Sequence, residues 1–193
     1  MLDRTNSGTL PTQGVHHITL VGADRRTSIE FWTELLGMPF VFEQPNLDNP
    51  NESHLYFDPG DGRLITIFTD ESRAADATRT STAVGAVHHL AFTVSQSVFD
   101  QVEARLDARH VAHSGRKDRG FMESIYFEDP LGLTIELTYN RFTVPEGHRI
   151  ADVMIAAHRV RVAEGARNIQ QIHIARAIEG LTAARDSLPA RTD

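Results

Sequence analysis

The stretch Val15-His16-His17-Ile18-Thr19-Leu20-Val21 returns further along the chain as Val87-His88-His89-Leu90-Ala91-Phe92-Thr93-Val94. In each copy a histidine pair opens a run in which apolar residues alternate with other residues, and this pattern predicts a β-strand. His17 and His89 therefore occupy matching places in two copies of one unit. If the copies pair about a pseudo-twofold axis, these two side chains converge on one point.

The residues after the first histidine pair predict a β-α-β-β-β unit. We expect a helix between Asp24 and Gly37, because Thr27 and Glu30 have capping-box spacing, an apolar stripe follows, and Gly37 suits the C-terminal end. Strands are expected at three places after it, Phe40 to Glu43, His54 to Phe57 and Leu64 to Phe68.

The second copy repeats this order. We expect a strand from Val87 to Val94, a helix from about Gln96 to Ala108, and strands at Val111 to Ser114, Ser124 to Phe127 and Leu133 to Tyr139. The motif Tyr56-Phe57-Asp58-Pro59 corresponds to Tyr126-Phe127-Glu128-Asp129-Pro130, with a shift of one residue. The chain therefore predicts an α+β fold of two βαβββ modules.

The two modules divide the rest of the chain into shorter segments. We expect a flexible N-terminus at 1–13, module one at 14–69, a small and polar linker at 70–85, and module two at 86–140. After Arg141 the apolar residues follow helical spacing, so residues 141–193 are expected to form a C-terminal helical extension with a frayed end at Pro189 to Asp193. Its helices would pack outside the sheet or across a subunit interface.

Composition excludes several classes of function. With 193 residues, of which 40% are hydrophobic, the chain can form one compact domain with an ordinary core. The absence of cysteine excludes disulfides, thiolate nucleophiles and sulfur ligands, so a metal would be held by histidine and carboxylate. A net charge of -7 disfavours nucleic acid and anionic membrane as partners, and the lack of a long apolar run or signal core predicts a cytoplasmic protein.

Side-chain alternation selects three candidate metal ligands. His17 shares a strand face with Thr19, and His89 shares one with Ala91. Glu136 falls on the same face as Thr134 and Thr138, opposite Ile135 and Leu137, so its carboxylate is expected to point into a cavity lined by a curved mixed sheet. Two histidines and one carboxylate with open positions form the facial triad of non-haem iron oxygenases.

The duplication also predicts which residue stands opposite Glu136 in the first module. Aligning Gly62 with Gly132 puts Thr66 at that place, and threonine is a poor metal ligand. Three protein ligands would leave positions for substrate and dioxygen. His16 and His88 are equally compatible with surface or capping roles and with a role beside the ligands. The remaining histidines without paired spacing, His110, His113, His148, His158 and His173, are expected to be solvated.

These motifs resemble the vicinal oxygen chelate superfamily, which includes glyoxalase I, extradiol dioxygenases, epimerases and fosfomycin or bleomycin resistance proteins. The resemblance covers about residues 14–140, and the segments VHHLAF and Asp118 to Gly132 most resemble hydroquinone-type ring-cleaving dioxygenases. It implies Fe(II), or Mn(II), on His17, His89 and Glu136, an acid/base role for His88, and contacts of Arg119 and Tyr126 with substrate oxygens. Those enzymes usually contain four repeats, whereas this chain contains two.

The resemblance implies an extradiol-type dioxygenase acting on a catechol or hydroquinone with O₂, in a homo-oligomer. Two other readings share the fold. A glyoxalase- or epimerase-type lyase or isomerase usually needs a fourth protein ligand where Thr66 stands. A metal-free binding protein of the resistance kind would not need the three ligands. The sequence favours the dioxygenase.

Overall fold

The computed structural model describes residues 12–78 and 80–186, and it divides into two compact units. The first unit runs to His88 and includes Glu128–Leu133; the second consists of His89–Phe127 and the chain from Thr134 onward. The frayed end expected at Pro189 to Asp193, and nearly all of the flexible N-terminus expected at 1–13, lie outside the described residues.

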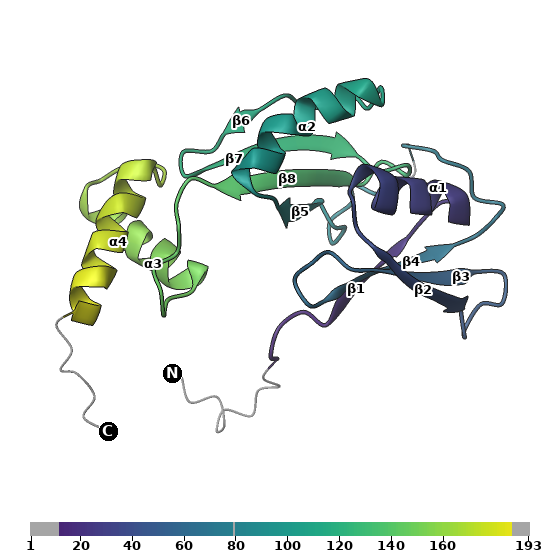
Figure 1. The fold of residues 1–193 in the computed structure, drawn as a ribbon, viewed down its shortest axis with the longest axis horizontal. Coiled ribbons are helices and arrows are strands. Elements are labelled where there is room, and N and C mark those ends of the chain that lie inside the picture. The colour runs from purple at the N-terminus through teal and green to yellow at the C-terminus, as the bar shows by residue number, and fades with distance from the viewer. Residues whose placement is uncertain (1–11, 79, 187–193) are drawn as a thin grey trace. The chain divides into compact units, whose positions relative to one another are not determined.

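The first unit contains the first βαβββ module (Figure 1). Its four-stranded mixed sheet has the order β1-β4-β3-β2, in which β1 runs parallel to β4 and the other neighbours are antiparallel. The elements are β1 (His17–Val21), α1 (Arg25–Ile29), the π-helix η1 (Glu30–Leu35), β2 (Phe40–Pro45), β3 (Ser53–Phe57) and β4 (Leu64–Thr69). The expected order of elements is confirmed.

The start of the first helix differs from the expectation. Asp24, and not Thr27, is the N-cap: its Oδ1 accepts a hydrogen bond from the Thr27 amide at 2.8 Å, and its Oδ2 accepts one from the Thr27 hydroxyl at 2.7 Å. A carboxylate in this position also complements the positive end of the helix, so aspartate prevails over the threonine three residues later. These hydrogen bonds, led by the Thr27 amide, hold the pKa of Asp24 below its ordinary value.

The second unit contains the second module and the C-terminal helices. Its sheet has the order β5-β8-β7-β6, again with the first strand parallel to the last. The elements are β5 (His89–Thr93), α2 (Gln96–Ala108), β6 (Lys117–Asp118), β7 (Met122–Glu128), β8 (Thr134–Asn140), α3 (Ile150–Ala163) and α4 (Gln171–Asp186). The α+β fold with two modules and a helical C-terminal part is thus confirmed.

The strand expected at Val111 to Ser114 is wrong in position. Here His113 makes a single bridge to Phe127, and the regular edge strand is β6. The ladder breaks because the Ser114 hydroxyl accepts the Tyr126 amide at 3.0 Å, and Gly115 follows with a φ of 65° that β-strands do not adopt.

Each module buries its own apolar layer. In the first, Trp32 is buried together with Leu55, Phe57 and Ile67 of the sheet, and in the second, Phe99 and Leu106 of α2 are buried with Ile125 and Ile135 of the sheet. None of the helices in the described ranges is long and apolar enough to span a membrane.

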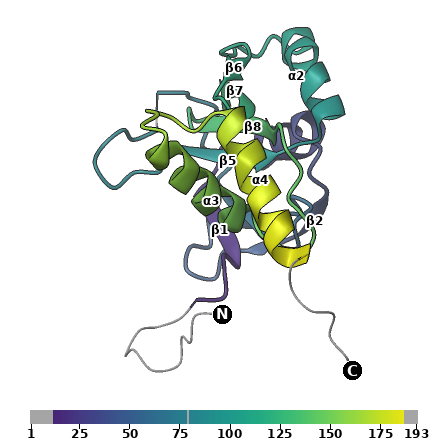
Figure 2. The ribbon, with the colours of Figure 1, turned by 90° about the vertical axis from the view of Figure 1, so that its left-hand side faces the viewer.

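The helices α3 and α4 lie side by side and form a small core of their own (Figure 2). The buried residues Val153, Ala157, Ile174 and Ala177 form its centre, and Phe121 and Phe142 pack against it. Gln171 of α4 also donates a 2.9 Å hydrogen bond to the Arg141 carbonyl. The C-terminal helices are therefore attached to the β6–β7 turn and to the end of β8.

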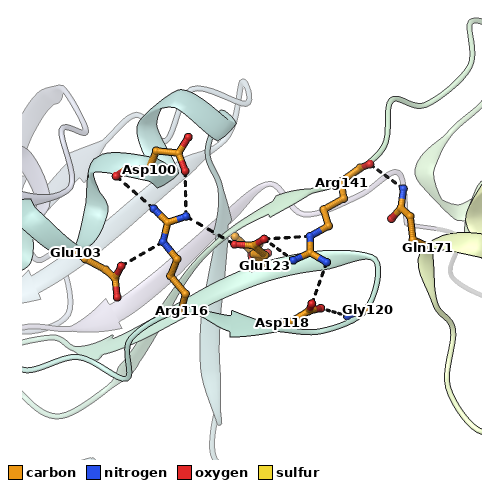
Figure 3. Close-up of polar contacts among 9 residues, drawn as sticks. Asp100, Glu103, Arg116, Asp118, Gly120, Glu123, Arg141 and Gln171 are labelled. Atoms are coloured by element: carbon orange, nitrogen blue, oxygen red, sulfur yellow. Dashed lines mark hydrogen bonds and ion pairs between the residues drawn. The ribbon is translucent and has the colours of Figure 1, made fainter.

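A network of charged side chains surrounds Arg141, whose carbonyl accepts the hydrogen bond of Gln171 (Figure 3). Arg141 pairs with Glu123 of β7 and, at 3.0 Å, with Asp118 of β6. The Glu123 carboxylate raises the pKa of Arg141 above its ordinary value. Arg116 extends the network to α2 through Asp100 at 3.0 Å and Glu103 at 3.2 Å.

Candidate functional site

The strand register confirms that Thr66 and Glu136 occupy equivalent positions. Thr66 of β4 pairs with Thr19 of β1, two residues after His17, and Glu136 of β8 pairs with Ala91 of β5, two residues after His89. Neighbouring paired residues project from the same face of a sheet. In each module, the histidine of the first strand therefore lies on the same sheet face as Thr66 or Glu136 of the last strand.

The second unit brings two of the predicted ligands into contact. His89 Nε2 lies 3.0 Å from Glu136 Oε2. The histidine side chain is 34% exposed, whereas the glutamate side chain is only 4% exposed. The pair thus consists of a buried carboxylate and an imidazole that reaches from it toward the surface.

The other oxygen of Glu136 tests whether the donor set of this pair fits a cation. Oε1 is buried and has no hydrogen-bond partner among the residues that the structure describes. An ionised carboxylate oxygen without a partner is costly to bury, and a bound cation removes that cost. Two adjacent ligands with bonds of about 2.1 Å to a metal are separated by about 3 Å when the bonds meet at a right angle, which matches the observed His89–Glu136 distance.

Two further predicted residues adjoin this pair. The ring of Tyr126 meets the ring of His89 edge-on, with centroids 6.1 Å apart. Arg119 donates a 3.3 Å hydrogen bond from Nη2 to the Tyr126 hydroxyl, and its guanidinium lies 5.4 Å from the centre of the tyrosine ring. The second unit thus gathers Arg119, Tyr126, His89 and Glu136 into one continuous set of contacts.

The remaining predicted site residues belong to the first unit. His17 is exposed at the start of β1, and its Nδ1 lies 2.8 Å from Nδ1 of His16. His88 is exposed and directly precedes β5. In the described part of the chain, no third histidine or carboxylate joins His89 and Glu136 as a three-ligand group, so the set of His17, His89 and Glu136 stays a prediction.

The first unit carries an aromatic and polar cluster that the sequence reasoning missed. His54 of β3 lies 4.3 Å, centroid to centroid, from both Tyr56 and Phe68. Its Nδ1 is 2.9 Å from the Tyr56 hydroxyl, and its Nε2 is buried with no hydrogen-bond partner in the described part of the chain. Burial lowers the pKa of His54, and the charge of His17 lowers it further. Two features of the sequence could have pointed to this cluster: the side-chain alternation along β3 and the correspondence between Tyr56 and Tyr126.

One histidine expected to be solvated is buried instead. His173 is 3% exposed, accepts the Gln170 amide on Nδ1 at 2.8 Å, and has Nε2 3.3 Å from Glu164. His113 also departs from the expectation, because its side chain is only 14% exposed and lies 3.1 Å from Asp107. Local capping contacts of this kind leave no periodic trace in a sequence.

Residues 14–137 match the model of the Glyoxalase/Bleomycin resistance protein/Dioxygenase superfamily, so the chain belongs to this superfamily. It is 29% identical over 126 residues to the proposed ring-cleaving dioxygenase MhqO of Bacillus subtilis (strain 168). This alignment covers 65% of this chain and 40% of MhqO. It is 30% identical over 125 residues to the glutathione transferase FosA of Serratia marcescens, which covers 65% of this chain and 79% of FosA.

Solved structures show the same fold. A proposed dioxygenase from Bacillus subtilis (subsp. subtilis str. 168) aligns with a TM-score of 0.53 and 26% identity, over 70% of this chain and 45% of the other. A glyoxalase family protein from Enterococcus faecalis aligns with a TM-score of 0.53 and 23% identity, over 65% of this chain and 97% of the other. The chain spans about two fifths of the length of its MhqO relative.

Proposed function

We propose that this chain is an Fe(II)-dependent extradiol-type dioxygenase that cleaves a small aromatic diol, a catechol or a hydroquinone, with O₂. The observation that carries the proposal is the buried Glu136 carboxylate. One of its oxygens contacts His89, and the other has no hydrogen-bond partner among the described residues. The similarity to MhqO supports the choice of ring cleavage within the superfamily.

The proposed metal ligands are His17, His89 and Glu136. His17 is included because it occupies the place in β1 that His89 occupies in β5. Imidazole nitrogen and carboxylate oxygen suit Fe(II), and Mn(II) is a second metal that this donor set accepts. When bound, the metal supplies open positions for the oxygens of the diol and for O₂.

The other proposed residues act on the substrate's oxygen and its proton. Arg119 places a positive charge beside the Tyr126 hydroxyl, and the two groups together stabilise negative charge on a phenolic oxygen. Tyr126 also meets the His89 ring, so the hydroxyl and the metal ligand belong to one contact chain. The imidazole of His88 can accept and release a proton, so we assign it the proton transfer.

A second candidate is a transfer reaction of the FosA kind. The match to FosA covers most of that protein, whereas the match to MhqO covers less than half of MhqO. A glutathione-consumption assay separates this candidate from ring cleavage, because a ring-cleaving dioxygenase consumes O₂ and leaves glutathione unchanged.

Anaerobic reconstitution with Fe(II), followed by oxygen uptake over a set of catechols and hydroquinones, tests the proposal. We expect one O₂ consumed per diol cleaved. The variants His88→Ala, Arg119→Ala and Tyr126→Phe should keep their iron, and at least one should lose about a hundredfold or more in turnover. Parent-like turnover in all three would remove their assigned roles, and no uptake with any diol would overturn the dioxygenase.

A further inference from the structure

The β6–β7 turn, α3 and the connection between α3 and α4 line an open cavity of the second unit, of about 680 Å³. This volume falls within the range of about 300–1,000 Å³ that is common for small-molecule sites. The cavity adjoins the candidate site directly, because its lining includes Arg119, which donates to the Tyr126 hydroxyl.

The lining of this cavity is strongly cationic. Three arginines line it, Arg119, Arg161 and Arg167, together with His158. The one carboxylate among the lining residues is that of Asp118, and Arg141 neutralises it at a distance of 3.0 Å. Like charges that share a cavity repel one another, so an anion bound among them is stabilised.

The arginines differ in their existing contacts. Arg161 donates to the carbonyls of Ala166 and Arg167, at 2.8 and 2.9 Å, so it also shapes the connection between the helices. Across the described ranges, Arg167 makes no ion pair. Its guanidinium therefore retains its capacity to bind a carboxylate through two parallel hydrogen bonds.

The connection between α3 and α4, which carries Arg167, packs closely against the β6–β7 turn. Gly120 has a φ of 89°, and a Cβ atom there would lie 2.8 Å from the Ile169 carbonyl oxygen, which is closer than real Cβ contacts allow. Phe121 packs into the α3–α4 core, and its carbonyl accepts the Arg141 amide at 3.0 Å. Arg161 and Arg167 are therefore held close to Arg119 by backbone packing.

We propose that this cavity binds a carboxylate group of the substrate, so that the substrate is an aromatic diol that carries an acidic substituent. Arg167 and Arg161 hold the carboxylate, and Arg119 links this pocket to Tyr126 beside His89. The assignment of this carboxylate to the substrate rests on the proposed function, whereas the anion site itself rests on the residues that line the cavity.

Calorimetric titration of the metal-free protein tests the anion site without any turnover. The probes are gentisate, which is hydroquinone with a carboxylate, its neutral amide gentisamide, hydroquinone itself and inorganic phosphate. We expect gentisate to bind about tenfold or more tightly than gentisamide, because a charge-assisted pair distinguishes them. Equal binding of these two compounds would overturn the inference.

Two matched variants locate the effect. In Arg167→Gln the preference for gentisate over gentisamide should disappear. Arg159→Gln should keep this preference, because Arg159 is an exposed residue of α3 that does not line the cavity. Circular dichroism checks that both variants fold. An unchanged preference in Arg167→Gln would overturn the assignment, and tighter binding of phosphate than of gentisate would overturn the carboxylate as the ligand.

Activity measurements keep this inference apart from the proposed function. A clear gentisate preference in binding, combined with no oxygen uptake on any diol, would remove the dioxygenase and leave the anion site. Oxygen uptake on hydroquinone and gentisate with equal efficiency would leave the dioxygenase and remove the acidic substituent.

Discussion

The two modules carry different residues at one equivalent strand position, Thr66 in β4 and Glu136 in β8. In the first, Thr66 is fully buried and donates a 2.8 Å hydrogen bond to Thr19 on the neighbouring strand. In the second, Glu136 stands at that position and pairs with Ala91, and one of its oxygens has no partner within residues 12–78 and 80–186. One module satisfies its buried polar group internally, and the other leaves that group available to a ligand.

This difference shows how a duplicated fold can build an asymmetric site. The strand pairing is the same in both modules, so the backbone presents the two positions in the same way. Only the side chains decide whether the position is closed by a hydroxyl pair or open with a carboxylate. The following substitutions exchange or remove these features, and they are ordered by the size of the expected effect.

Replacing His89 by alanine should have the largest effect. The variant loses one of the three proposed ligands, and the remaining carboxylate and imidazole hold a metal poorly. Elemental analysis of anaerobically prepared protein should show about one metal per chain in the parent and little in His89→Ala. Thr66→Val, in the first module, is the control and should keep its metal; undiminished iron in His89→Ala would contradict the ligand set.

Thr66→Glu makes the first module resemble the second. The added carboxylate would supply a fourth ligand and compete with the diol for an open position, so turnover should fall strongly while the metal content stays or rises. Oxygen uptake and elemental analysis on the same preparation measure both quantities. A fully active Thr66→Glu enzyme would mean that this position does not reach the metal.

Ala91→Thr makes the second module resemble the first. Ala91 pairs with Glu136, so the introduced hydroxyl can donate to the carboxylate as the Thr66–Thr19 pair does. A competing hydrogen bond to this charged group should weaken metal binding about tenfold. Metal titration against a chelator measures the change, and Ala91→Val, which adds a similar shape without a hydroxyl, should retain more affinity than Ala91→Thr.

The helix caps provide the smallest contrast between the modules. Asp24 caps α1 with a carboxylate, whereas Ser95 caps α2 with a hydroxyl that accepts the Val98 amide at 3.2 Å. Either residue replaced by alanine should lower the free energy of unfolding by about 1 kcal/mol at neutral pH. Urea unfolding followed by circular dichroism measures these losses.

The two losses should differ in their dependence on pH. Hydrogen bonds from Thr27 lower the pKa of Asp24 in the folded protein, so its stabilisation is present above the unfolded pKa and is lost as pH falls through the folded pKa. The cost of Asp24→Ala should therefore shrink below about pH 4, while that of Ser95→Ala stays constant. Parallel pH profiles for the two variants would contradict the charged cap.

The repeat and the strand faces could be predicted from sequence because they depend on local alternation. That reasoning correctly placed Thr66 at the position equivalent to Glu136, and it found the helical spacing of the apolar residues in α3 and α4. It failed where two local signals compete, as for Asp24 and Thr27, and where a side chain replaces a backbone partner, as at Ser114. The burial of His54 and His173 depends on neighbours that are distant in sequence or on capping contacts, which alternation does not reveal.

The parallel pairing of the first strand with the last has a consequence for the order of folding. The hairpin between β3 and β4 closes a short loop, whereas β1 must wait for β4, and β5 for β8, across nearly the whole module. Contacts between distant segments cost more chain entropy and form later. On the ribosome, His89 and Glu136 can meet only after β8 has emerged, so the candidate site is among the last parts of its module to assemble.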